Sequence, residues 1–155
     1  MLSTMQDRQL TVQALFQHGA GIHADSRIAG FDGERVTYTS FRERASRIAK
    51  LARALRRLGI APGDRVGSFC WNTPEHLEAY LAVPSMGAVL HTLNARLFPE
   101  QLSYIVNHAA DRVIVVDGSL APVLAKAAGA FTTVERYLVF GKQSADLPGE
   151  CLDYE

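Results

Sequence analysis

Residues Gly63 to Asn94, which read GDRVGSFCWNTPEHLEAYLAVPSMGAVLHTLN, decide the fold. The run from Arg65 to Trp71 is rich in apolar residues and predicts a buried strand. Pro74 follows an Asn-Thr pair that can cap a helix, and a proline costs nothing at the first helical position because its missing N–H would have no intrahelical partner. The helix is predicted to stop at Gly87, and Val89 to Leu93 predicts a second buried strand. A strand, a crossover helix and another strand form a βαβ unit, in which the strands are parallel and the crossover is right-handed.

The helix is predicted to begin at Pro74. It carries the apolar residues Leu77, Tyr80, Leu81 and Pro84 toward the stop at Gly87. The acids Glu75 and Glu78 lie three residues apart on the same helix, an arrangement that usually faces water. We therefore predict that both carboxylates are exposed.

A hairpin is predicted upstream. The β-prone runs Arg27 to Phe31 and Glu34 to Thr37 flank an Asp-Gly pair, which is typical of a type I′ turn because both central positions need positive φ. Residues 1–26 are predicted to be a helical lead-in, with a short helix within Met1 to Gln17.

A long amphipathic helix is predicted from Ser40 to Leu58. Its apolar residues recur at helical spacing and form one stripe, Phe41, Ala45, Ile48, Leu51, Ala52, Leu55 and Leu58. The opposite face is strongly basic and carries Arg42, Arg44, Arg47, Lys50, Arg53, Arg56 and Arg57. This face is either simply solvated and balanced by the acidic C-terminal third of the chain, or it binds a membrane surface or another anionic partner.

Further elements follow the second strand. Pro99 predicts the first residue of a helix, which leaves Phe98 at the cap position without a capping oxygen, so we expect packing to hold it. The β-branched run Val113 to Asp117 predicts a strand that is buried on both faces of a parallel sheet.

The last part of the chain is predicted to add a helix over Ser119 to Ala128 and a final strand over Val134 to Phe140. Residues 142–155 contain a Pro-Gly pair and few apolar residues, and they predict a surface loop. Strands that alternate with helices predict that residues 27–141 form one three-layer α/β/α subdomain with a mostly parallel sheet and an N-terminal antiparallel hairpin.

Charge and cysteine content exclude several classes of function. The 155 residues include 16 basic and 16 acidic side chains, so no net field would recruit nucleic acid. Two cysteines, Cys70 and Cys151, make neither a disulfide framework nor a metal pair, and the five histidines lack ligand spacing. No apolar run approaches the ~20 residues of a membrane span, and the N-terminus does not resemble a secretory signal. We therefore expect a cytoplasmic protein without a bound metal.

Two segments resemble the N-terminal part of AMP-forming acyl-CoA synthetases, the fatty-acid–CoA ligases of the adenylate-forming superfamily. One is His76 to Asp117, HLEAYLAVPSMGAVLHTLNARLFPEQLSYIVNHAADRVIVVD, within which Val83 to Asn94 is similar to the second core motif. The other is Val36-Thr37-Tyr38 followed by the helix that ends in Leu55 to Val66, LRRLGIAPGDRV, and it is similar to the first core motif and its linker. The resemblance covers roughly Thr37 to Gly141, and it departs from the fatty-acyl branch at Ala95, where that branch usually has proline.

The resemblance implies a chemistry for a longer enzyme. Such ligases use ATP and Mg²⁺ to adenylate a medium- or long-chain fatty acid and then transfer the acyl group to coenzyme A. The phosphate-binding Ser/Thr/Gly-rich loop with its lysine, and the adenine, ribose and mobile lysine motifs, lie downstream of the matched segment in that family. We therefore expect an N-terminal fragment that is inactive alone, and no catalytic, cofactor-binding or metal-binding residue is carried over.

One polar cluster is a candidate for ligand proximity. Residues His91, Thr92, Asn94 and Arg96 lie at the carboxyl end of a predicted parallel strand, where ligands gather in open α/β sheets. The alternative is that Asn94 and Arg96 only shape the turn and bind neighbouring backbone.

Two functions remain as alternatives. The chain is either part of a fatty-acid–CoA ligase or a stand-alone α/β interaction module that binds a partner or a membrane through the basic helix 40–58. Within the ligase class, an aryl acid or another carboxylate is an alternative substrate. The expected partners of the whole enzyme are fatty acid, ATP and coenzyme A, with no nucleic acid, and we also consider peripheral contact with the inner membrane face and a homodimer.

Overall fold

The computed structural model describes residues 9–31, 36–142 and 145–155. Its centre is a five-stranded, wholly parallel sheet in the order β4-β3-β5-β6-β7. The strands of this sheet are β3 (Arg65–Phe69), β4 (Val89–Thr92), β5 (Asp111–Asp117), β6 (Arg136–Phe140) and β7 (Glu150–Asp153). The predicted βαβ unit is confirmed, because β3 and β4 pair in parallel and α3 (Pro74–Ser85) joins them.

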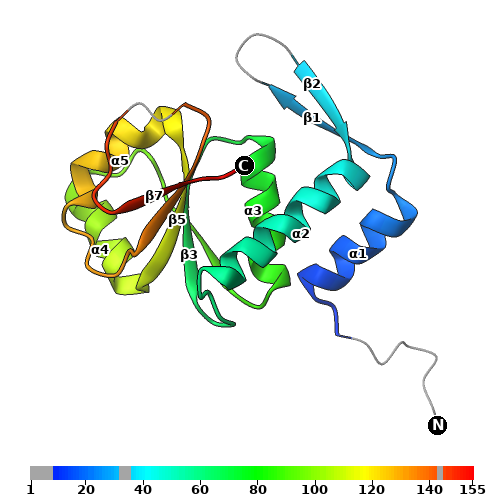
Figure 1. Cartoon of the computed structure of the whole chain (residues 1–155), viewed down its shortest axis with the longest axis horizontal. Coiled ribbons are helices and arrows are strands. Elements are labelled where there is room, and N and C mark those ends of the chain that lie inside the picture. The colour runs from blue at the N-terminus through cyan, green and yellow to red at the C-terminus, as the bar shows by residue number, and fades with distance from the viewer. Residues whose placement is uncertain (1–8, 32–35, 143–144) are drawn as a thin grey trace.

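Helices cover both faces of this sheet (Figure 1). One face packs against α2 (Phe41–Arg57) and α3, and the other packs against α4 (Pro99–Ala109) and α5 (Ala121–Ala128), which follows a 3₁₀ turn at Gly118–Leu120. Alternate residues of β5 serve the two faces, and all four of its central side chains, Val113, Ile114, Val115 and Val116, have no exposed surface. The α/β/α layering predicted from the sequence is therefore confirmed.

A smaller unit stands beside the three layers. Strands β1 (Arg27–Phe31) and β2 (Val36–Ser40) pair antiparallel as the predicted hairpin, while the Asp-Gly turn between them lies outside the described residues. Helix α1 (Val12–Ile22) packs against α2 and α3 (Figure 1), and it extends beyond Gln17, where the predicted helix was expected to end.

The start of α2 is fixed by its own sequence. The Ser40 side chain accepts a hydrogen bond from the Glu43 N–H at 3.3 Å, and the Glu43 carboxylate accepts one from the Ser40 N–H at 2.7 Å. These reciprocal bonds form a capping box, which satisfies two N–H groups that have no intrahelical partner. Thr73 caps α3 by the same principle, through its side-chain oxygen and the His76 N–H.

Two of the predicted C-terminal features are wrong. Residues 142–155 are not only a surface loop, because Glu150–Asp153 form β7 and pair in parallel with β6, so the strand over Val134 to Phe140 is not the last. The pairing is made by main-chain groups and by an ion pair between Arg136 and Glu150 at 2.6 Å. Leu152 is half-buried and its neighbours in β7 are exposed. The segment therefore lacks the apolar pattern from which a strand is predicted.

Three local predictions also need correction. Strand β4 is an edge strand with no fully buried residue, not a buried strand. Phe98 is 71% exposed, so packing does not hold it, and its N–H instead donates to the Gln101 side-chain oxygen at 3.2 Å. Glu78, predicted to face water, lies on the buried face of α3 together with His76, Ala79, Ala82 and Val83.

Candidate functional site

The four residues predicted to lie near a ligand do not form one cluster of contacts. Asn94 and Arg96 meet as the turn alternative predicted, since the Asn94 side-chain oxygen accepts a hydrogen bond from the Arg96 N–H at 2.9 Å. Thr92 is exposed at the end of β4. His91 instead contacts Asp111, so its ring is held by the sheet and not by the turn.

The contact between His91 and Asp111 lies inside the sheet layer. Nδ1 of His91 is 2.8 Å from Oδ2 of Asp111, whose side chain is fully buried. Burial raises the pKa of Asp111, although the hydrogen bond from His91 acts in the opposite direction. Gly67 of β3 lies beside this pair, and a Cβ there would lie 3.1 Å from Ile114, 3.3 Å from Leu93 and 3.4 Å from Oδ2 of Asp111. We therefore assign His91 a structural role that sequence position alone did not indicate.

A hollow lies at the carboxyl end of β3, where the hairpin meets α3. It has a volume of about 290 Å³ and is lined by Ile28, Ala29, Asn72, Thr73, Pro74, His76, Leu77 and Tyr80. The hairpin approaches α3 closely at Gly30, because a Cβ at that position would lie 2.7 Å from Cγ of Pro74. The hollow is therefore built by two segments that are more than forty residues apart in the sequence.

His76 forms the polar wall of this hollow. Its Nδ1 lies 3.1 Å from the Trp71 carbonyl oxygen and its Nε2 lies 3.0 Å from Oγ of Ser68. A carbonyl oxygen only accepts, so Nδ1 carries the proton and Nε2 accepts the Ser68 hydroxyl. Burial lowers the pKa of His76, which keeps the ring neutral. Ser68 is only 1% exposed, so this pair orders the wall of the hollow and does not present a nucleophile.

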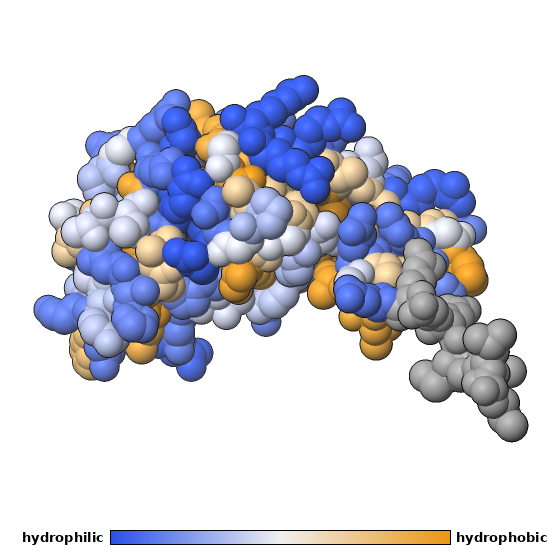
Figure 2. Space-filling model, turned by 90° about the horizontal axis from the view of Figure 1, so that it is seen from below, coloured by the Kyte–Doolittle hydropathy of each residue, from blue (hydrophilic) through white to orange (hydrophobic). Residues whose placement is uncertain are grey.

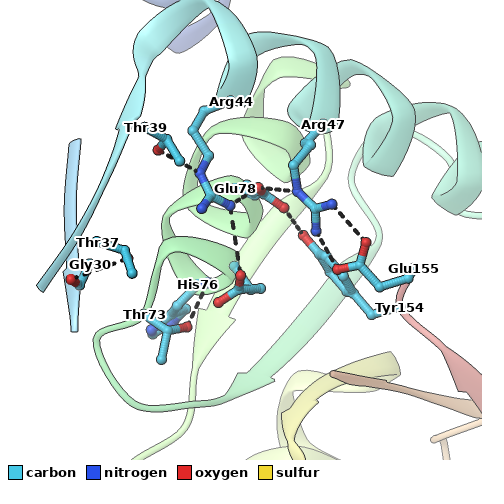
Figure 3. Close-up of polar contacts among 11 residues, drawn as sticks. Gly30, Thr37, Thr39, Arg44, Arg47, Thr73, His76, Glu78, Tyr154 and Glu155 are labelled. Atoms are coloured by element: carbon cyan, nitrogen blue, oxygen red, sulfur yellow. Dashed lines mark hydrogen bonds and ion pairs between the residues drawn. The ribbon is translucent and has the colours of Figure 1, made fainter. Parts of the chain in front are cut away.

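A buried carboxylate ties α2, α3 and the segment after β7 together (Figure 3). Oε1 of Glu78 accepts from Arg44 and from Arg47, each at 2.6 Å, and Oε2 accepts from the Tyr154 hydroxyl at 2.7 Å. Arg47 also binds both carboxylate oxygens of Glu155, at 2.7 and 2.6 Å. The hydrogen bonds that Arg47 donates to Glu155 raise the pKa of Arg47, and burial together with Glu78 raises the pKa of Tyr154.

The exposed position predicted for Glu78 is therefore wrong. The side chain is 1% exposed and faces α2, although Glu75 keeps partial exposure at 24%. A signal was present in the sequence, because Ala79, Ala82 and Val83 continue the same face at helical spacing.

The described residues offer no metal centre, since no group of three His, Cys, Asp or Glu side chains among them could hold an ion. Within the same residues, no helix is both long and apolar enough to cross a bilayer. These residues thus form an apolar hollow with a neutral imidazole and a buried network of ion pairs. Both are suited to holding neighbouring segments of the chain in position.

Sequence comparison identifies relatives of this chain. The family model described as AMP-binding enzyme matches residues 16–152. The medium-chain-fatty-acid–CoA ligase of Ectopseudomonas oleovorans is 37% identical over 155 residues, which is 96% of this chain and 28% of the relative. The long-chain-fatty-acid–CoA ligase of Thermus thermophilus and the 3-methylmercaptopropionyl-CoA ligase of Ruegeria lacuscaerulensis are each 38% identical, over 93% and 94% of this chain.

Solved structures share the fold. A putative long-chain-fatty-acid CoA ligase from Rhodopseudomonas palustris superposes with a TM-score of 0.79 at 23% identity, over 94% of this chain and 36% of that one. The anthranilate CoA ligase AuaEII, in complex with anthranoyl-AMP, superposes with a TM-score of 0.75 at 22% identity, over 87% of this chain and 26% of that one. The chain spans just over a quarter of the length of the curated relatives that it matches. The match over residues 16–152 places this chain in the family of AMP-binding enzymes.

Proposed function

We propose that this chain is the N-terminal α/β portion of an AMP-forming ligase that converts a medium- or long-chain fatty acid into its coenzyme A thioester. The observation that carries the proposal is the 37 to 38% identity to a medium-chain and a long-chain fatty-acid–CoA ligase over more than nine-tenths of the chain. The fold agrees with it, because the solved structures of an anthranilate CoA ligase and of a putative long-chain-fatty-acid CoA ligase share this fold.

The contribution of this portion would be mechanical. Ligases of this kind must bring the carboxylate and ATP together and stabilise the charge that grows on the α-phosphate, which requires N–H donors, Mg²⁺ and a cation. The described residues have no grouping of side chains for a metal ion, and the printed sequence has no glycine-rich loop followed by lysine. We infer that ATP, Mg²⁺ and coenzyme A are bound by the remainder of the enzyme and that this portion supplies a packed layer.

Exposed apolar side chains support a packing role. Phe31 and Val36 face each other across the hairpin and are 65% and 53% exposed, and Tyr38 beside them is 63% exposed. On the face seen from below, hydrophobic side chains reach the surface at several places among hydrophilic ones (Figure 2). A sheet face of this composition is the kind of surface that other protein normally covers.

The experiment that tests the proposal is ATP–pyrophosphate exchange with a panel of acids. It compares the chain alone with a version extended to the next in-frame stop in its source DNA. We expect exchange with medium- or long-chain fatty acids in the extended protein only. Exchange by the chain alone would contradict the mechanical role, and a preference for aryl acids in the extended protein would contradict the fatty-acid assignment. If the source DNA has no extension and nothing exchanges, the interaction module replaces the ligase.

A further inference from the structure

The basic face of α2 is divided into two halves with different surroundings. In the first half, Arg44 and Arg47 bind acids supplied by the chain itself, Glu78 and Glu155. In the second half, the cations are exposed, namely Lys50, Arg53, Arg56 and Arg57. No ion pair joins these four to another residue within ranges 9–31, 36–142 and 145–155.

A hollow lies beside the second half, between α2 and the edge of the sheet. Its volume is about 460 Å³ and it is lined by Lys50, Arg53, Ala54, Arg57, Leu58, Leu138, Leu152 and Asp153. Leu138 of β6 is only 5% exposed and Leu152 of β7 is half-buried, so the apolar floor is recessed below the charged rim. Figure 2 shows strongly hydrophilic side chains projecting together beside apolar surface at the upper edge of the molecule.

The shape of this surface restricts what it can bind. A helix that binds a bilayer must place protruding apolar side chains among the lipids, whereas here the apolar residues are recessed and the cations project. The rim cations extend from Lys50 to Arg57, a rise of about 10 Å along the helix, which is longer than a single carboxylate head group can span. A ligand with a row of acids beside apolar side chains would match both the recessed apolar floor and the row of projecting cations.

We propose that the hollow between α2 and β7 docks an acidic amphipathic helix of a protein partner. A leucine-sized side chain would fill the hollow above Leu138 and Leu152, while acids at intervals of three or four residues would face Lys50, Arg53 and Arg57. The first half of α2 already binds an acid in this way, because Glu155 approaches Arg47 from outside α2 and binds it through both carboxylate oxygens.

The test is an NMR titration of the full chain with a stapled helical peptide that carries three leucines on one face and glutamates beside them. We expect chemical-shift changes at Ala54, Leu138 and Leu152, together with affinity that falls as salt rises. Arg53→Glu combined with Arg57→Glu should weaken binding at least about tenfold through charge reversal at the rim. Ala54→Trp should weaken it as well, because it fills the hollow and leaves every charge in place.

Matched controls make the result decisive. Arg42→Glu reverses an exposed charge in the first half of α2, 71% exposed and 3.8 Å from Asp25, and should leave peptide binding unchanged. A peptide with lysines in place of its glutamates should not bind. The proposal is overturned if the acidic peptide causes no shift at the hollow, or if Ala54→Trp and the double reversal bind it as the parent chain does. It is also overturned if only anionic vesicles or free dodecanoate produce the shifts.

Discussion

Glu78 holds three cationic or hydroxyl donors around a carboxylate that water does not reach. An ion pair of this kind need not stabilise a protein relative to apolar residues, but the loss of one partner leaves the other charge buried and unpaired. Substitution of Glu78 is therefore expected to be destabilising mainly because it would leave its buried cationic partners unpaired.

Glu78→Gln is expected to lower the free energy of unfolding by about 3 kcal/mol. The physical reason is that Arg44 and Arg47 keep their positive charges while their common anion becomes neutral. Urea unfolding measures the change. Glu150→Gln removes one partner of an exposed pair and serves as control, with an expected loss below about 1 kcal/mol. Equal losses in the two variants would contradict the buried network.

His76 predicts the direction of a pH effect. Burial lowers its pKa in the folded state, so the unfolded chain takes up the proton at a higher pH than the folded chain does. The stability that neutral His76 contributes is complete above the ordinary pKa of about 6.5 and is lost as the pH falls through the lower folded value. Protonation would also prevent Nε2 from accepting the Ser68 hydroxyl.

We expect urea midpoints of the parent chain to fall between about pH 7.5 and pH 5 more steeply than those of His76→Gln. His108 is exposed, so His108→Gln should keep the steeper dependence of the parent chain. If His76→Gln retains the full slope, the pH dependence arises elsewhere and the assignment of a neutral, buried imidazole is wrong.

At the scale of elements, the position of the hairpin depends on a close approach to α3. A Cβ at Gly30 would lie 2.7 Å from Cγ and 3.3 Å from Cδ of Pro74, and a proline ring at a helix start cannot turn away. The hairpin must therefore shift from α3 if any side chain is added there.

Gly30→Ala is expected to lower the free energy of unfolding by about 1 to 3 kcal/mol and to speed amide exchange in β1 and β2. Gly21→Ala is the matched control, because no atom lies within 4 Å of its Cβ position in α1. That change should be neutral or stabilise by up to about 1 kcal/mol. A neutral Gly30→Ala would mean that the hairpin does not pack on Pro74.

The elements that the sequence predicted well carry their own local signals. Ser40 with Glu43, Thr73 with Pro74 and the β-branched run of β5 each specify a boundary or a buried strand within a few residues. The buried position of Glu78 was predicted wrongly, because acids three residues apart on a helix usually face water, whereas Arg44 and Arg47 of α2 bind this carboxylate in the fold. Strand β7 has four residues and depends on β6 for pairing, so its own sequence could not reveal it.

The candidate site was predicted less well than the fold. His91, Thr92, Asn94 and Arg96 were grouped by sequence position alone, and the register of three strands separates them by directing His91 toward Asp111. Conversely, the hollow beside His76 joins residues of β1 and α3, and no local pattern reports a contact between segments so far apart. A surface built from distant segments can be recognised only once the fold is known.

At the scale of the whole molecule, the exposed hairpin face predicts self-association. Phe31, Val36 and Tyr38 form an exposed apolar face, which a second copy of the chain can cover. Sedimentation velocity should detect concentration-dependent association, and Phe31→Ser combined with Tyr38→Ser should reduce it without unfolding the chain. A monodisperse monomer that binds no hydrophobic dye would contradict this prediction.

The central claim is that this chain supplies a packed layer of a fatty-acid–CoA ligase and not its acid specificity. The most direct test is a chimera in which the chain replaces the segment that it matches in the medium-chain-fatty-acid–CoA ligase of Ectopseudomonas oleovorans. Acyl-CoA formation is measured with acids of increasing chain length. We predict an active chimera with the acid preference of the unaltered ligase. A folded chimera that is inactive, or that prefers a different class of acid, would contradict the claim.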